Sequence, residues 1–261
     1  ISFLFFLNLR TNLTFCFVYL ILFNFTFYTF LNLQILYQDE HLVAINKPNG
    51  LAVHKSKLVG NTNEFALQLL RDQIRKRVYP AHRLDRKTSG VMLFTLAEKV
   101  SSMLQKQFME RNVSKNYLAI VRGYTETHEV IDYPLTNYSG KVQEAITEYS
   151  RVASSELDLP YGKHETSRYS LISLTPKTGR THQIRKHMNH IRHPIIGDRP
   201  HGCNKQNKLF KNRWEVNTMM LHASEIEFSH PITNKKMLLK ADLPNEFKRT
   251  LKILSLNFTS A

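Results

Sequence analysis

The chain has 261 residues, with 36 Lys and Arg against 21 Asp and Glu, so its formal net charge is +15. This length is ample for a hydrophobic core, and 42% hydrophobic with 22% charged residues excludes a chain that is disordered throughout. Cys16 and Cys203 are the two cysteines, which excludes a disulfide framework and a zinc site built from thiolates. A pI near 9.8 favours a polyanionic partner, with nucleic acid ahead of an anionic membrane surface.

Residues 1–33 differ in composition from the rest of the chain. They carry one charge, Arg10, and nine of the 16 Phe residues. Residues 13–31 form an apolar run that is long enough to cross a bilayer as a helix. The segment lacks Gly, Ala, Pro, Asp, Glu, Lys and His, and several of its common residues have AT-rich codons. We therefore interpret residues 1–33 as translated upstream sequence or a misplaced start, with a membrane anchor as the alternative.

The next segments predict two strands, a turn and a helix. Residues 35–37 and 42–45 are short apolar runs separated by two acidic residues, a pattern typical of paired strands. The sequence KPNG at residues 47–50 predicts a tight turn. Residues 64–78 carry apolar side chains at helical spacing, with arginine and lysine elsewhere around the helix.

The middle of the chain predicts further strands around a second helix. Residues 91–96 are a continuous apolar run, which indicates a buried strand. Residues 100–108 have the spacing of an amphipathic helix. Residues 117–121 form another apolar run, and residues 144–152 and 169–174 alternate between apolar and polar side chains as half-buried strands do.

The last third predicts a loop, a short basic helix, two strands and a final helix. Residues 153–167 are polar and contain Pro and Gly, so we expect a loop there. Residues 184–191 place three apolar side chains on one helical face. Residues 219–228 and 237–239 have the pattern of strands, and Pro244 is expected to open a helix.

These elements follow one another without a regular strand–helix alternation. This order predicts an α+β fold with a mixed, largely antiparallel central sheet flanked by helices and loops. We expect residues 34–261 to form one catalytic domain.

The densest polar motif is HRLDRKTSG at residues 82–90, which precedes the predicted buried strand. Its one carboxylate, Asp85, lies among three cations, so we expect it to be ionised and to accept hydrogen bonds only. No other acidic residue lies within ten positions, and Thr88-Ser89-Gly90 suits a tightly shaped loop. A functional aspartate is therefore favoured over an ordinary ion-paired loop residue.

The motif HRLDRKTSG resembles the catalytic motif of the RluA-type pseudouridine synthases. The resemblance covers residues 34–251, and its other motifs occur in the expected order: ILYQDEHLVAINKPNG, KNYLAIVRG, PKTGRTHQIRKH, HPIIGD and LHASEIEFSHP. Details such as LYQDEHLVAINKP, RDQI and RHPIIGD are similar to the tRNA pseudouridine synthase C subgroup. Several separate motifs in one order are much more specific than any one of them.

The resemblance implies a pseudouridine synthase fold and a defined chemistry. The enzyme would isomerise a uridine of tRNA, uridine 65 of the T-stem, without a cofactor or a metal. It would act as a monomer in the cytoplasm, on RNA and not on DNA, and without a membrane unless residues 1–33 are genuine. The alternatives are an rRNA-directed synthase of the same family, a non-catalytic RNA chaperone and a membrane-tethered nucleic-acid binder.

The same resemblance assigns the central chemistry to two residues. Asp85 would attack C1′ of the sugar or remove the C2′ proton, and the sequence leaves both routes open. Tyr117 would stack on the extruded base and assist proton removal from C5. Without the resemblance, Tyr117 reads as a tyrosine in a core strand.

Four further residues are expected to bind the substrate or to hold Asp85. Arg83 would help to hold the duplex open. Arg185 is the first candidate for the cation that pairs with Asp85, and Arg180 is the second. Ile184 would pack against the base pocket. The alternative for the arginines is a phosphate contact or plain surface charge, and for Ile184 it is ordinary helix core.

Two further patterns could indicate a metal site or a nucleotide-binding loop. His187, His190 and His193 recur every three residues, but no carboxylate or Cys lies near them, so we predict no metal site. Lys177-Thr178-Gly179-Arg180 lacks the spacing of a nucleotide-binding phosphate loop, and an RNA phosphate contact is the better functional interpretation.

Overall fold

The structure is a computed structural model that describes residues 32–54 and 64–257. The interpretation of residues 1–33 as upstream sequence or an anchor concerns residues that lie almost entirely outside this description. Leu33–Ala261 form a compact unit. Across the described residues, we find no helix that combines the length and the apolar character needed to cross a membrane.

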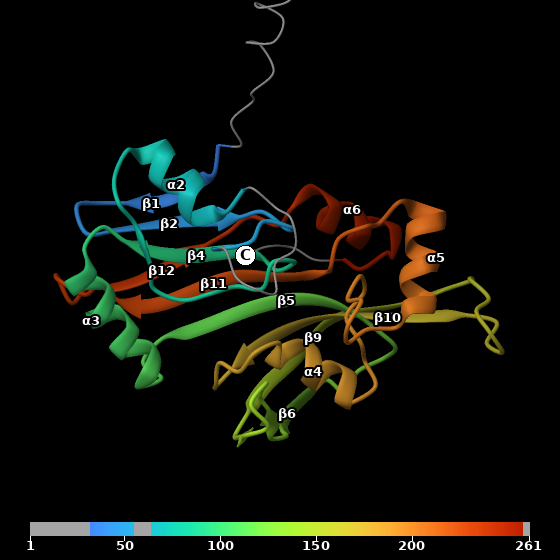
Figure 1. Cartoon of the computed structure of the whole chain (residues 1–261). Coiled ribbons are helices and arrows are strands. Elements are labelled where there is room, and N and C mark those ends of the chain that lie inside the picture. Colours follow the sequence, from blue (N-terminus) through green and yellow to red (C-terminus); the bar gives the residue numbers. More distant parts are fainter. Residues whose placement is uncertain (1–31, 55–63, 258–261) are drawn as a thin grey trace, which may run out of the picture. The chain divides into compact units, whose positions relative to one another are not determined.

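A ten-stranded sheet forms the framework of this unit (Figure 1). Its strands are β1 (Gln34–Gln38), β2 (Leu42–Lys47), β3 (Tyr79–Pro80), β4 (Ser89–Thr95), β5 (Ser114–Arg122), β6 (His128–Asp132), β9 (Ile146–Leu157), β10 (Ser167–Pro176), β11 (Leu221–Ser229) and β12 (Lys236–Lys240). The strand order is β1-β2-β4-β11-β5-β10-β9-β6, with β12 paired to β11 and β3 paired to β4. The β4–β11 pair is parallel and the other ladders between these strands are antiparallel, which confirms the predicted mixed, largely antiparallel sheet.

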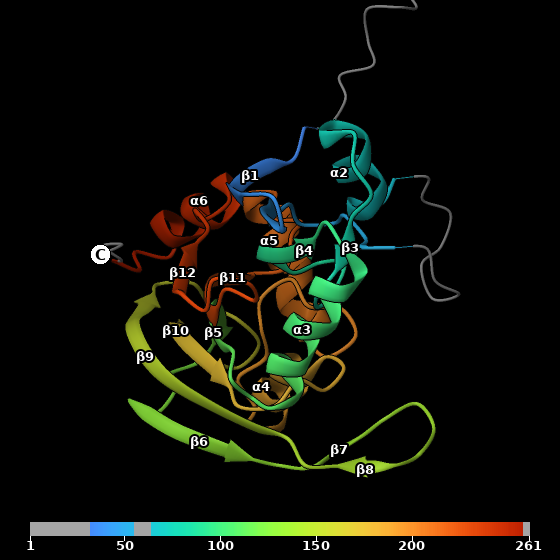
Figure 2. The ribbon, with the colours of Figure 1, turned by 90° about the vertical axis from the view of Figure 1, so that its left-hand side faces the viewer.

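Helices and a small hairpin complete the unit. The helices are α2 (Ala66–Ile74), α3 (Glu98–Met109), α4 (Gln183–His190), α5 (Asn204–Trp214) and α6 (Asn245–Ile253). The strands β7 (Leu135–Thr136) and β8 (Val142–Gln143) form a separate hairpin, which Figure 2 shows extending beyond the main sheet. The α+β class predicted from the sequence is therefore correct.

Strands β2 and β4 are apolar on both faces because helices cover both faces. Met92 and Phe94 of β4 belong to one buried cluster together with Leu70 of α2. Leu93 belongs to a second cluster together with Leu104 of α3. Strand β4 is buried along its whole length, which explains why its sequence is a continuous apolar run rather than an alternating one.

The centre of the sheet joins segments that are far apart in the sequence. Strand β11 lies between β4 and β5, so a strand from the last quarter of the chain separates two strands from its first half (Figure 1). Gly90 is part of this contact, because it is in register with Ala223 of β11. A Cβ at position 90 would collide with the backbone of Ala223, and the φ of Gly90 is +114°, which glycine tolerates best.

In the second half of the chain, one prediction needs correction and one helix was missed. The loop expected at residues 153–167 is wrong in its first part, because β9 continues to Leu157 and pairs with β10 as far as Ser167. This part of β9 alternates only between intermediate and exposed side chains, so its sequence is polar and lacks a buried face. Helix α5 was not predicted, since it buries only Gln206 and Phe210 and has no apolar stripe.

Candidate active site

The loop that carries Asp85 runs from β3 to β4 and is attached to the turn that follows β2. The backbone N–H of Thr88 donates to the carbonyl of Asp85 at 3.0 Å, which closes a turn around the aspartate. The N–H of Gly50 donates to the carbonyl of Arg86 at 2.9 Å. Asp85 is thereby held at one place relative to the sheet, with its side chain 28% exposed.

Lys47 holds the same two segments together from the inside. Its side chain is fully buried, and its Nζ donates to the carbonyls of Pro48 at 2.9 Å, Leu51 at 2.8 Å and Arg86 at 3.2 Å. Burial lowers the pKa of Lys47 to about 7, and the carboxylate of Asp85 opposes this shift. Three acceptors match the three N–H donors of an ammonium group, which favours the charged form. The sequence KPNG predicted only a turn at this lysine, and no pattern indicated that its side chain is buried.

Arg185 of α4 binds the carboxylate of Asp85. Its Nη1 donates to Oδ2 at 2.8 Å, whereas its Nε and Nη2 donate to the two oxygens of Asp198 at 2.7 and 2.8 Å. Arg185 and Asp198 are buried, with 5% and 1% of their side chains exposed. Burial acts to lower the pKa of Arg185, but the hydrogen bonds to Asp198 and Asp85 outweigh it and raise that pKa. The guanidinium is therefore a permanent cation fixed beside Asp85.

Tyr117 of β5 lines the same cavity. It is in register with Leu174 of β10 and Ala223 of β11, and its ring packs against two of the three core clusters. Burial, together with the negative charge of Asp85, raises the pKa of its hydroxyl far above the ordinary value of 10.0. The hydroxyl therefore stays protonated. The geometry agrees with both interpretations of Tyr117, because the ring belongs to the core and also faces the cavity.

The cavity around these residues has a volume of about 810 Å³. Its lining includes all six residues predicted from the sequence: Arg83, Asp85, Tyr117, Arg180, Ile184 and Arg185. Asp85 is the one acidic residue among the described residues that line it, and several basic residues line it as well: Arg83, Arg111, Lys115, Lys177, Arg180 and Arg185. Of the arginines predicted to pair with Asp85, Arg185 makes the contact and Arg180 does not.

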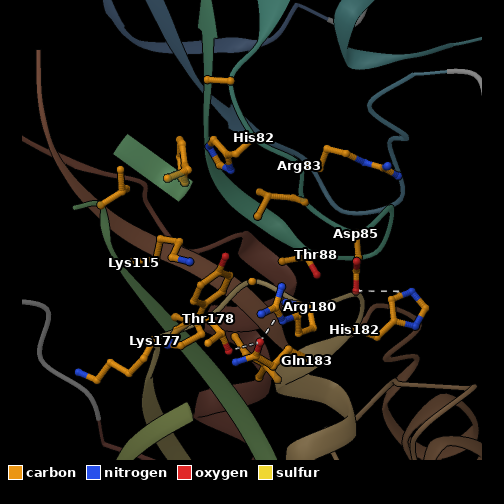
Figure 3. A pocket seen from close by; sticks show the side chains of 18 of the residues that line it. His82, Arg83, Asp85, Thr88, Lys115, Lys177, Thr178, Arg180, His182 and Gln183 are labelled. Carbon is orange, nitrogen blue, oxygen red and sulfur yellow. Dashed lines mark hydrogen bonds and ion pairs between the residues drawn. The ribbon is translucent and has the colours of Figure 1, made fainter. Parts of the chain in front are cut away.

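Arg180, Arg83 and Ile184 occupy different parts of the wall. The Nε of Arg180 donates to the carbonyl of Glu144 at 2.9 Å, so its side chain lies along the edge of the cavity. Arg83 is exposed, and its guanidinium lies apart from the carboxylate of Asp85 in Figure 3. Ile184 is 7% exposed and belongs both to the core and to the cavity wall.

Gln183 orders the turn that leads into α4. Its Oε1 accepts hydrogen bonds from the hydroxyl of Thr178 at 2.7 Å and from the N–H of Arg180 at 2.9 Å. Its Nε2 donates to the carbonyl of Ile146 at 2.9 Å. These bonds fix the start of α4, and with it the position of Arg185, against β9. Gln183 lies within the motif PKTGRTHQIRKH, but nothing in the sequence alone separated its role from that of its neighbours.

His82 is a partly exposed, neutral residue in the wall of the cavity. Its Nε2 accepts a hydrogen bond from the N–H of Leu93 at 3.0 Å. Burial, with a smaller contribution from Lys115, lowers its pKa to about 3. Within residues 32–54 and 64–257 we find no group of three or more His, Cys, Asp or Glu side chains able to hold a metal ion, and the absence of a metal stays a prediction.

The charges that line the cavity are suited to a polyanionic ligand. One anchored carboxylate faces a cavity whose other charged residues are cations, within an α+β fold built on a mixed sheet. Residues 41–190 match the family model described as RNA pseudouridylate synthase. The chain belongs to this family, and it is therefore an isomerase.

Relatives with known names support this assignment over most of the chain. A protein of Vibrio parahaemolyticus named tRNA pseudouridine synthase C is 45% identical over 228 residues, which cover 83% of this chain and 93% of that protein. The protein of the same name from Haemophilus ducreyi is 43% identical and covers 88% of this chain and 98% of its own length.

Solved structures agree with the fold. Human RNA pseudouridylate synthase domain containing 4 has a TM-score of 0.66 and 25% sequence identity, with 87% of this chain and 95% of that chain covered. Human RNA pseudouridylate synthase domain containing 1 has the same TM-score at 22% identity, with 83% and 85% covered. The pseudouridine synthase fold expected from the sequence is confirmed.

Proposed function

We propose that this isomerase converts a uridine of tRNA, uridine 65 of the T-stem, into pseudouridine, with Asp85 as its catalytic carboxylate. The observation that carries the proposal is the ion pair between Asp85 and Arg185 inside a cavity lined by cations. The tRNA substrate is supported by the relatives that bear the name tRNA pseudouridine synthase C.

The two oxygens of Asp85 have different environments, which suits the reaction. Oδ2 accepts the hydrogen bond from Arg185, whereas Oδ1 has no hydrogen bond to any described residue. Oδ1 is therefore the oxygen that attacks C1′ or takes the C2′ proton. By either route the C1′–N1 bond breaks and a C1′–C5 bond forms. C5 then loses its proton and N1 gains one, so the isomerisation needs no external reactant.

Tyr117 supports the reaction mainly through its ring. The raised pKa of its hydroxyl makes a phenolate base unfavourable at neutral pH. Stacking on the extruded base is the role that its position on the cavity wall favours. The hydroxyl assists removal of the C5 proton only as a hydrogen-bonding partner.

The remaining predicted residues contact the RNA around the target. Ile184 forms the apolar part of the wall against which the base packs. Arg180 and Arg83 contact phosphates, and Arg83 also helps to hold open the duplex from which the uridine leaves. We place this activity in a catalytic domain of residues 34–261 that works as a monomer on cytoplasmic tRNA.

Pseudouridine mapping in a strain without the gene tests the proposal. We expect the modification at uridine 65 of tRNA to be absent and to return when the wild-type gene is supplied. Loss of an rRNA pseudouridine instead would assign the enzyme to rRNA. An unchanged modification pattern, together with a defect in RNA folding, would favour an RNA chaperone and contradict the proposal.

A further inference from the structure

A pair of histidines lies beside the catalytic carboxylate. His182 immediately precedes α4, and its Nε2 lies 3.9 Å from Oδ2 of Asp85, the contact drawn as a dashed line in Figure 3. Its Nδ1 lies 2.8 Å from Nε2 of His201, and the two rings meet edge to face with centroids 5.0 Å apart. Neither ring takes part in the isomerisation that we propose for Asp85.

The backbone around the pair holds both rings in place. His182 has a φ of +57°, a left-handed conformation that histidine, asparagine and aspartate adopt more readily than other residues with side chains. The N–H of His201 donates to Oδ1 of Asp198 at 3.3 Å. Asp198 also binds Arg185, so the histidine pair and the arginine that holds Asp85 share one anchor.

Burial, more than the surrounding charges, favours the neutral form of both rings. Burial is the main cause that lowers the pKa of His182 and of His201 below 6.5. Arg185 and Lys186 act in the same direction on both rings, and Asp198 opposes them. Asp85 opposes the shift at His182, and each ring therefore carries a single N–H at neutral pH.

Two neutral rings that share one hydrogen bond can be arranged in two ways. If Nδ1 of His182 donated, the lone pair on its Nε2 would face the negative charge of Asp85, which is repulsive. If Nε2 of His201 donates instead, Nε2 of His182 carries the proton and directs an N–H towards Oδ2 of Asp85. The second arrangement is the favourable one.

We propose that His182 is a positioning residue for Asp85 and that His201 selects its tautomer by donating to Nδ1. This inference rests on the role proposed for Asp85. The Nε2–H of His182 and the Nη1–H of Arg185 then both face Oδ2, which restricts rotation of the carboxylate and keeps Oδ1 towards the substrate. At 3.9 Å the contact is longer than a hydrogen bond, and it is expected to tighten when RNA fills the cavity.

Nitrogen NMR of the full chain with labelled histidine tests the tautomer directly. Protonated and unprotonated ring nitrogens have clearly different chemical shifts. We expect the Nε2–H tautomer at His182 in the wild type and a mixture of tautomers in His201→Phe. A predominant Nδ1–H tautomer at His182 in the wild type would overturn the proposal. This measurement needs no activity, so it is independent of whether uridine 65 is the target.

Single-turnover rates test the consequence for catalysis. His201→Phe should lower the rate by about tenfold, the effect of one lost orienting hydrogen bond, with little change in RNA affinity. His201→Gln, whose amide can donate to Nδ1 of His182, should recover most of the rate. His164→Phe, on an exposed loop, is the matched control and should leave the rate unchanged.

A folded His201→Phe enzyme with the wild-type rate would contradict a positioning role. Should the phenylalanine variant fail to fold, His201→Ala and His182→Asn replace it, because asparagine tolerates the left-handed backbone of position 182. Equal rates for His201→Ala and His201→Gln would likewise overturn the inference. A wild-type enzyme inactive on tRNA would contradict the proposed substrate instead.

Discussion

Arg185 donates hydrogen bonds from three guanidinium nitrogens, which are shared between Asp198 and Asp85. This division decides which oxygen of Asp85 is left without a hydrogen bond. Asp198 takes two of these hydrogen bonds in a bidentate pair, which leaves Nη1 for one oxygen of Asp85. A guanidinium can serve two carboxylates because its donors form a rigid planar fork, whereas the ammonium of a lysine is a point charge. The other oxygen of Asp85 has no hydrogen bond to a described residue, which suits the role at the sugar that we propose for it.

Asp85→Asn tests this arrangement at the level of the reacting atom. The amide keeps the size of the side chain and one acceptor for Arg185, but it loses the charge and the nucleophilic oxygen. We expect no detectable pseudouridine and an RNA affinity within about tenfold of the wild type. Single-turnover assays and filter binding measure the two quantities. A rate above about a hundredth of the wild-type rate would remove Asp85 from the chemistry.

Tyr117 has two interpretations that a pair of variants separates. Tyr117→Phe keeps the ring and should bind RNA normally, with at most a slower final proton transfer. Tyr117→Ala removes stacking worth about 1–3 kcal/mol per base and should weaken RNA binding. Thermal stability, RNA affinity and the single-turnover rate are measured for both.

The alternative makes a different prediction for the same variants. If Tyr117 served only the core, alanine would cost about 3–5 kcal/mol of stability. In that case phenylalanine would be fully active, and RNA affinity of the folded alanine variant would not change.

At the scale of elements, single side chains connect loops that belong to different strands, and one of these connections holds the loop that carries Asp85. Lys47 ties the turn after β2 to the loop before β4, across 39 residues of sequence. Asp39 ties the turn between β1 and β2 to the turn between β11 and β12, because its Oδ2 accepts from Nε2 of His230 at 2.8 Å. Each of these side chains connects two turns or loops that no strand pairing connects directly.

Lys47→Met removes the first tie while it preserves side-chain volume. The carbonyls of Pro48, Leu51 and Arg86 lose a shared donor, and an unsatisfied buried polar group costs about 1–3 kcal/mol. We expect lower stability in urea unfolding and a reduced rate, because the loop that bears Asp85 loosens. Lys236→Met, at an exposed position, is the control. A stability equal to that of the control would show that the buried ammonium contributes nothing.

The contact of Asp39 with His230 predicts that the stability of the protein depends on pH. Burial acts to raise the pKa of Asp39, but hydrogen bonds from Tyr37, two backbone N–H groups and His230 lower it to about 2. A carboxylate with a lowered folded-state pKa stabilises the protein above its unfolded-state pKa of about 4, and this contribution is lost as the pH falls towards about 2.

Asp39→Asn should therefore cost about 2 kcal/mol at neutral pH and progressively less below about pH 4. Urea unfolding of wild type and variant across this range measures the difference. The exposed Asp158→Asn serves as the control. A cost that does not change with pH would contradict the assignment.

The elements that the sequence predicted well are those with a clear apolar pattern. Helices α2 and α3 and strand β4 have one, because they cover or form the core. Helix α5 and the end of β9 lack such a pattern. Helix α5 buries only two side chains, and the end of β9 has partly exposed side chains on one face and exposed side chains on the other. Their structure comes from pairing and packing with distant segments, which a local pattern does not record.

At the scale of the whole molecule, the site is assembled from contacts that no local signal contains. Asp85 and Arg185 lie 100 residues apart, and only the family resemblance suggested that they meet. Asp198 and His201 were not predicted to take part, although both belong to the network around Asp85. An isolated aspartate or histidine in a polar segment has no sequence feature that reveals its burial, because burial depends on the sheet order.

The charge of the whole chain leads to the last prediction. A formal net charge of +15 and a cavity lined by cations imply that RNA binding neutralises several phosphates and releases counterions. If about five phosphates are neutralised, a fourfold rise in salt should weaken binding by about five-hundredfold. Arg83→Gln should reduce the slope of log affinity against log salt by about one, because Arg83 lines the cavity.

Lys236→Gln, on an exposed strand, should leave that slope unchanged, which separates a phosphate contact from the general effect of net charge. Affinity for one tRNA is measured at several salt concentrations for each variant. Equal slopes for Arg83→Gln and the wild type would place Arg83 outside the phosphate contacts. A flat dependence for the wild type would mean that the basic surface faces a partner other than RNA, since binding to phosphates always releases counterions.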